Sequence, residues 1–83
     1  MSGRNRHWYA QLAAASLASI DEFRAFALRT RGFRFSSDYA ARIAMMKLRI
    51  ALPEVAAKEK QAAREWLTAH GCSHSIFRLG PGS

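Results

Sequence analysis

The hydrophobic positions of this 83-residue chain recur at intervals of three and four residues, which is the spacing of amphipathic α-helices. In the first such segment Trp8, Leu12 and Ala15 keep this spacing, and alanine, the strongest helix former, is frequent. The pattern predicts a helix over about residues 6–18. Residues 1–5 precede the pattern, and we expect them to be flexible.

A second helix is predicted over Ile20–Arg31. Ser19 and Glu22 fit a capping box, in which each side chain accepts a hydrogen bond from the other residue's backbone N–H. Gly32 suits a left-handed C-terminal cap, with Phe33 packing back on the last turn. The expected inner stripe consists of Phe23, Phe26, Ala27 and Thr30, and the more exposed side of Arg24, Leu28 and Arg31.

The third predicted helix begins after Ser36 or Ser37, either of which can cap it, and Pro53 ends it after Leu52. Its apolar positions follow a helical 4-3-4 spacing, which indicates a core stripe. That stripe consists of Tyr39, Ile43, Met46 and Ile50, and it is widened by Met45, Leu48 and Leu52. Because this stripe is the widest in the chain, we expect this helix to be central.

A fourth helix is predicted from Pro53, which suits a first helical turn, to His70, with Gly71 as the terminating residue. It carries two neighbouring apolar stripes: Val55, Ala62, Trp66 and Ala69 in one, and Ala56, Ala63 and Leu67 in the other. Residues 72–83 are expected to form a short extended tail tied to the core by Ile76, Phe77 and Leu79, with 80–83 flexible. The whole chain, residues 1–83, is therefore predicted to be one all-α domain of four helices.

The charge of the chain is strongly positive, with 13 Lys and Arg against 6 Asp and Glu, a net charge of +7. Ten of the 13 are arginine, whose planar guanidinium binds phosphate and carboxylate with two parallel hydrogen bonds. The excess centres on the turn between the second and third helices. The predicted binding site consists of Arg29, Arg31, Arg34, Arg42, Lys47 and Arg49, of which Arg42 and Arg49 are expected on one exposed face.

Two function hypotheses follow from this site. The first is a cytoplasmic, non-enzymatic nucleic-acid-binding or nucleoprotein-associated protein, because clustered cations suffice for phosphate binding through counterion release. The alternative is a small accessory or inhibitor protein, of the kind that phages and plasmids encode, which docks on an acidic surface of a host protein complex. The large rings also predict an association surface, either of a homodimer or of such a complex: Trp8, Tyr9, Phe33, Phe35 and Trp66.

The sequence partly matches two nucleic-acid-binding motifs. The segment RGFRF, residues 31–35, resembles the start of the RNP1 signature of RNA-recognition domains, although Arg34 stands where that signature has a small residue. That motif lies on a strand of a four-stranded sheet, and the flanking segments here are helical in pattern. A helix-turn-helix of the third and fourth helices would use Lys58, Lys60 and Arg64 as readers, but it has a proline in place of the usual three- or four-residue turn, which often contains glycine. A helix-turn-helix of the second and third helices has the more favourable charge but a longer, aromatic turn.

The residues that carry chemistry are few. His70, Cys72 and His74 offer two imidazoles and a thiol, whereas a structural zinc site needs four ligands, and His7 lies at the other end of the sequence. Cys72 with a neighbouring histidine could form a nucleophile pair, but no carboxylate is available nearby to orient the histidine. We therefore expect that the protein is not an enzyme and that it binds no cofactor and no metal. A single cysteine allows no internal disulfide.

No apolar run reaches the roughly 20 residues of a membrane span, and the polar breaks at Gln11 and Ser16 disfavour a targeting peptide.

Overall fold

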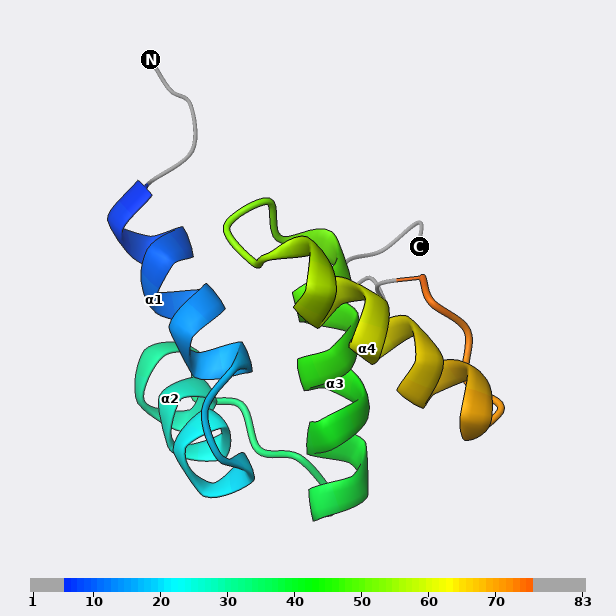
Figure 1. Ribbon diagram of the computed structural model, residues 1–83. Helices are drawn as coiled ribbons and strands as arrows, with labels where there is room; N and C mark the ends of the chain where they lie inside the picture. Colours follow the sequence, from blue (N-terminus) through cyan, green and yellow to red (C-terminus); the bar gives the residue numbers. More distant parts are fainter. Residues whose placement is uncertain (1–5, 76–83) are drawn as a thin grey trace, which may run out of the picture.

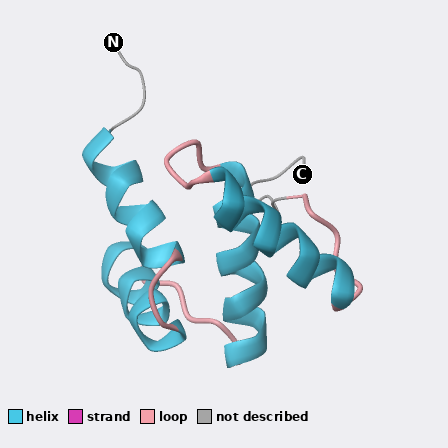
Figure 2. Cartoon of the chain, in the orientation of Figure 1, coloured by secondary structure: helices cyan, strands magenta, loops and turns pink. Residues whose placement is uncertain are grey.

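The computed structural model describes residues 6–75, in which the chain forms four helices and no strand (Figures 1 and 2). The helices are α1 (Arg6–Ser16), α2 (Ile20–Arg31), α3 (Asp38–Ala51) and α4 (Ala57–Ala69). The predicted all-α, four-helix fold is confirmed. Within the described part of the chain, every helix is too short or too polar to cross a membrane.

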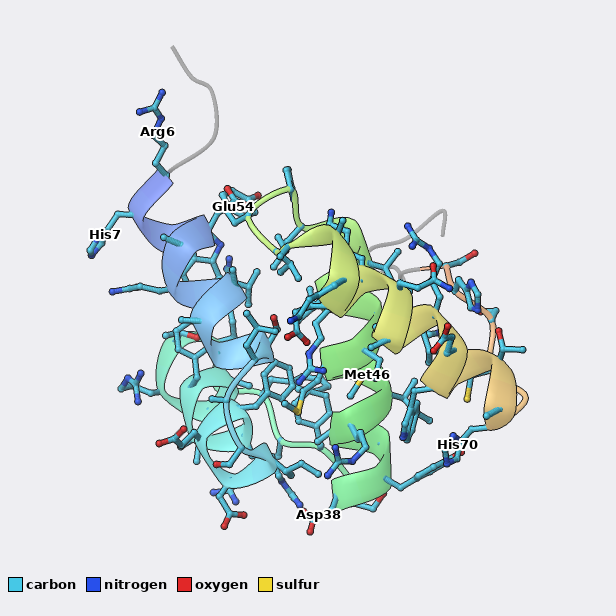
Figure 3. The ribbon with its side chains drawn as sticks, in the orientation of Figure 1. Arg6, His7, Asp38, Met46, Glu54 and His70 are labelled. Carbon is cyan, nitrogen blue, oxygen red and sulfur yellow. The ribbon has the colours of Figure 1, made fainter. Side chains whose placement is uncertain are left out.

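Helix α3 is the centre of the fold, as its wide apolar stripe predicts. Helices α1, α2 and α4 all pack against it, and α1 also packs against α2. Figure 1 shows α1 and α2 on one side of α3 and α4 crossing the other side. Buried Ala41, Ala44 and Met45 face the first pair, whereas Met46 packs against Ala63 and Leu67 of α4 (Figure 3).

Local capping explains the ends of α2 and the start of α3. Ser19 Oγ accepts a hydrogen bond from Glu22 N at 3.2 Å, and Ser37 Oγ accepts one from Ala40 N at 3.1 Å. Gly32 has a left-handed φ of 64°, and its N–H donates to the carbonyl oxygen of Leu28 at 2.9 Å. These bonds satisfy backbone groups that a helix end leaves without partners, as the sequence predicts. The capping box is only half formed, because among the described residues Glu22 accepts no hydrogen bond from Ser19 N.

The first and last predicted helices are shorter than expected. Helix α1 ends at Ser16, two residues early, because Leu17 and Ala18 donate three residues back in a tighter turn. Helix α4 begins at Ala57 and not at Pro53. Val55 is 3% exposed and its N–H donates to Leu52 O at 3.1 Å, so burial of this side chain holds residues 53–56 in a turn.

Three core predictions are wrong. Tyr39, expected in the core stripe, is 50% exposed, because at the start of α3 its ring reaches the rings of Trp66 and His70 on the surface of α4. On α4 the buried stripe contains Ala63 and Leu67, whereas Ala62 and Ala69 are exposed. Thr30, expected on the inner side of α2, is also exposed. The predicted flexible ends, 1–5 and 80–83, and the tail contacts of Ile76, Phe77 and Leu79 lie outside the described residues.

Candidate partner-binding groove

An open groove lies between α1, α2 and α3 and is continued by the segments 33–35 and 52–53. Its volume is about 930 Å³, which is large for a chain of this length. Its lining combines aliphatic side chains, among them Leu12, Ala44 and Leu48, with aromatic rings. Apolar side chains therefore form one continuous accessible surface.

Three alanines of α2 and α3 contribute little volume to the lining of the groove. Ala27 of α2 and Ala44 and Ala51 of α3 all line it, and their methyl groups fill little of the space between the helix axes. The opposite side of α3 shows the contrast, because there Met46 and Leu67 close the contact with α4. Each lining helix is amphipathic, but the apolar stripes on this side are not fully covered.

The rings along the groove hold one another in place. Trp8 stacks on Phe26 with ring centroids 5.4 Å apart. Phe35 packs against Phe23 at 5.5 Å and against Phe33, edge to face, at 4.7 Å. Such pairs favour a fixed arrangement of the rings. Four of the five rings from which the sequence predicts an association surface line the groove: Trp8, Tyr9, Phe33 and Phe35.

Arg31 provides a cation on the rim of this groove. Its Cζ atom lies 4.8 Å from the centroid of the Trp8 ring, and the side chain is exposed. Arg29 lies on another side of α2, because two residues along a helix are about 160° apart around its axis. Its Cζ atom lies 5.6 Å from the centroid of the Phe26 ring. Arg31 therefore lines the groove itself, whereas Arg29 lies over one of its rings, Phe26, without lining it.

Arg34 is exposed in the segment between α2 and α3 and lines a second, smaller recess with Arg24, Leu28 and Phe33. Arg24 is already committed, because it forms an ion pair with Asp38 and donates to the carbonyl oxygen of Phe35 at 2.9 Å. These two contacts of Arg24 anchor the segment that carries Phe33 and Phe35. Arg34 is the more available cation of the two.

Arg42 and Arg49, which the sequence predicts on one exposed face of α3, are both half-buried, and this part of the prediction is corrected. Arg49 is half-buried, and its Nε atom donates to the backbone oxygen of Ser16 at 2.7 Å. Burial lowers the pKa of Arg49, an effect opposed by Glu59 and reinforced by Arg42. Arg42 and Lys47 are half-buried as well, and Lys47 interacts within the protein. Arg49 thus supports the fold at the end of α1.

The segment His70–His74 makes hydrogen bonds around the end of α4. His70 Nδ1 lies 2.8 Å from Trp66 O, and its ring stacks on Trp66 at 3.9 Å (Figure 3). Cys72 Sγ lies 3.7 Å from His70 O, and His74 Nε2 lies 2.9 Å from Thr68 Oγ1. Over residues 6–75, the structure brings no three His, Cys, Asp or Glu side chains together in a metal-binding group. Partial burial and the Cys72 thiol raise the pKa of Tyr39.

Sequence reasoning predicted the groove's rings but missed the groove itself. The sequence signal was the small size of three lining residues, the alanines at positions 27, 44 and 51. No protein-family model, no curated protein and no solved structure matches this chain. The site is therefore interpreted from its own geometry.

Proposed function

We propose that this chain is a small, non-enzymatic accessory protein that binds an acidic surface of a partner protein through the groove between α1, α2 and α3. The observation that carries the proposal is an open apolar groove of about 930 Å³ with the exposed cation Arg31 on its rim. Grooves of this kind bind apolar side chains, and a rim charge selects the partner and its orientation. A cytoplasmic location is part of the proposal.

The lining supports a protein partner over nucleic acid. Bases are recognised by hydrogen bonds to their edges and by stacking on open ring faces. The Thr30 hydroxyl in the groove donates to Phe26 O at 2.7 Å, and the Trp8 ring is in contact with both Phe26 and Arg31. Leu and Ala side chains in the lining offer bases no partners, whereas they suit the apolar side chains of a protein.

Anilinonaphthalene sulfonate tests the proposal, because it combines an apolar body with one anionic group. We expect one saturable site on the folded protein, with cooperative thermal unfolding as the check that the fold is intact. Ala51→Trp fills the groove from an exposed position of α3 and should abolish binding, whereas Ala62→Trp on the exposed side of α4 should not. Arg31→Glu should weaken binding about tenfold. Unchanged binding to the Ala51→Trp variant would overturn the proposal.

Nucleic-acid binding is the second candidate, and a specific observation favours it. Arg29, Arg31 and Arg34 are exposed, and none of them pairs with a carboxylate among residues 6–75. Random-sequence duplex DNA, single-stranded DNA and RNA should be titrated at low and high salt. Binding that falls steeply with salt and is lost in Arg31→Glu/Arg34→Glu with unchanged helicity would make this candidate the function. No binding at low salt would eliminate it.

A further inference from the structure

We infer that the occupant of the groove is an amphipathic α-helix of a partner protein, with an acidic flank that meets Arg31. This inference rests on the proposed function and names the chemistry of the partner. It follows from the backbone groups, the length and the charge of the groove.

The backbone around the groove leaves an incoming segment few hydrogen-bond partners. Three of its sides are helices, whose N–H and C=O groups bond within the helix except in the terminal turns. In the connecting segment, Phe33 N donates to Ala27 O at 3.3 Å, and Phe35 O accepts from Arg24 at 2.9 Å. An extended peptide would therefore bury unpaired backbone groups, at a cost in free energy. A helix satisfies its own backbone and buries only side chains.

The length of the groove suits about two helical turns. Its α3 side extends from Ala44 to Leu52, a rise of about 12 Å. A bound helix of that length presents apolar side chains at positions i, i+3 or i+4, and i+7. The alanines at 27, 44 and 51 leave the space that such side chains would fill.

The charge around the groove selects an acidic helix. Among the described residues, no acidic side chain lines the groove, and Arg31 does. Between residues 23 and 53 the sole acid is Asp38, which pairs with Arg24. A second copy of this chain would add another net charge of +7 to the complex, so charge repulsion opposes self-association through this surface. A partner helix with Glu or Asp beside its apolar stripe is complementary.

The test uses designed peptides and the fluorescence of Trp8. Trp66→Phe in the full-length chain leaves Trp8 as the single tryptophan, in contact with Arg31 at the groove. The probes are a helical peptide with a leucine stripe flanked by Glu, the same peptide with Lys for Glu, and a scrambled Glu peptide of identical composition. We expect the helical Glu peptide to change Trp8 emission and to bind about tenfold or more tightly than either control.

Matched variants connect the binding to the groove. Arg31→Glu should reverse the preference between the Glu and Lys peptides, whereas Lys58→Glu makes the same charge change on the exposed part of α4 and should leave it unchanged. Ala51→Trp should abolish peptide binding, and Ala62→Trp should not. If Ala51→Trp fails to fold, the Arg31→Glu reversal alone decides the outcome, because that position is exposed.

Several results would overturn the inference. Equal binding of the scrambled and helical Glu peptides would exclude a helical occupant. Peptide binding that appears only after residues 76–83 are deleted would make the chain's own C-terminal segment the occupant. A dimer in solution that Ala51→Trp dissociates would make it a second copy. If anilinonaphthalene sulfonate binds but no peptide does, the inference of a helical occupant is overturned and the proposed function stands. If neither the sulfonate nor any peptide binds, both the inference and the proposed function are overturned.

Discussion

The Nε atom of Arg49 lies 2.7 Å from the backbone oxygen of Ser16, so a cation of α3 closes the C-terminal end of α1. The same guanidinium contacts the Met46 sulfur at 3.6 Å. Helix α1 ends without basic residues in its own last turn, and the carbonyl groups there need a donor from elsewhere. Arg49, which the sequence analysis assigns to a binding surface, therefore joins α1 to α3.

Arg49→Met should lower the free energy of unfolding by about 2 kcal/mol, because it removes a charge-assisted hydrogen bond and leaves Ser16 O without that donor. Urea unfolding at neutral pH measures the effect. Arg29→Met is the matched control, because Arg29 is exposed, and it should change stability by less than about 0.5 kcal/mol. Equal losses in the two variants would contradict a structural role specific to Arg49.

Gly32→Ala should cost about 1 kcal/mol of stability, because the left-handed φ of 64° strains any residue with a Cβ. No heavy atom lies within 4 Å of the position that an added Cβ would take, so the cost is conformational and not steric. Gly32→Asn should cost less, since Asn tolerates this conformation. Thermal unfolding of both variants checks the order, and an Asn variant less stable than the Ala variant would contradict it.

The open space of the groove can be tested by side-chain substitutions alone, without a ligand. Ala27→Leu adds volume towards the groove and should change stability by less than about 1 kcal/mol, because open space is present there. Ala63→Leu adds the same volume at the fully buried α3–α4 contact and should cost about 2 kcal/mol or more. Urea unfolding compares the two. Similar losses would mean that the space beside Ala27 is closed in solution.

The phenol of Tyr39 should titrate above its ordinary pKa of 10.0, because partial burial and then the Cys72 thiol disfavour the phenolate. A Tyr9→Phe background isolates Tyr39, and ultraviolet absorbance follows the ionisation. Cys72→Ala should move the midpoint down without removing the whole shift. Because the folded-state pKa is raised, this contribution to stability is present below pH 10 and is lost as the pH rises through the folded-state value. A midpoint at or below that of the urea-unfolded chain would contradict the assignment.

Local patterns predicted α2 and α3 closely because their ends are decided by nearby residues. Ser19, Gly32 and Ser37 satisfy backbone groups within a few positions of themselves. The start of α4 was missed because Pro53 suits a first helical turn and a tight turn equally well. Burial of Val55, which brings it against Ala13 of α1, decides between them.

The exposure of three residues of the predicted binding site has a similarly local cause. Exposure of Arg29, Arg31 and Arg34 follows from their place at a helix end and in a connecting segment. The divergence of Arg29 and Arg31 follows from helical geometry, and the sequence alone could have shown it. The role of Arg49 could not be predicted, since its partner oxygen is 33 positions earlier in the chain and meets it through packing of α1 on α3.

The sequence by itself determined the four amphipathic helices, the caps of α2 and α3, and the cationic stretch of residues 23–53, in which Asp38 is the one acid. These features depend on residues that are neighbours along the chain. Only the tertiary structure decided which apolar residues become core and which line an open groove. The physical reason is volume: whether Ala27 of α2 and Ala44 and Ala51 of α3 border open or closed space depends on all the side chains that helix packing brings around them.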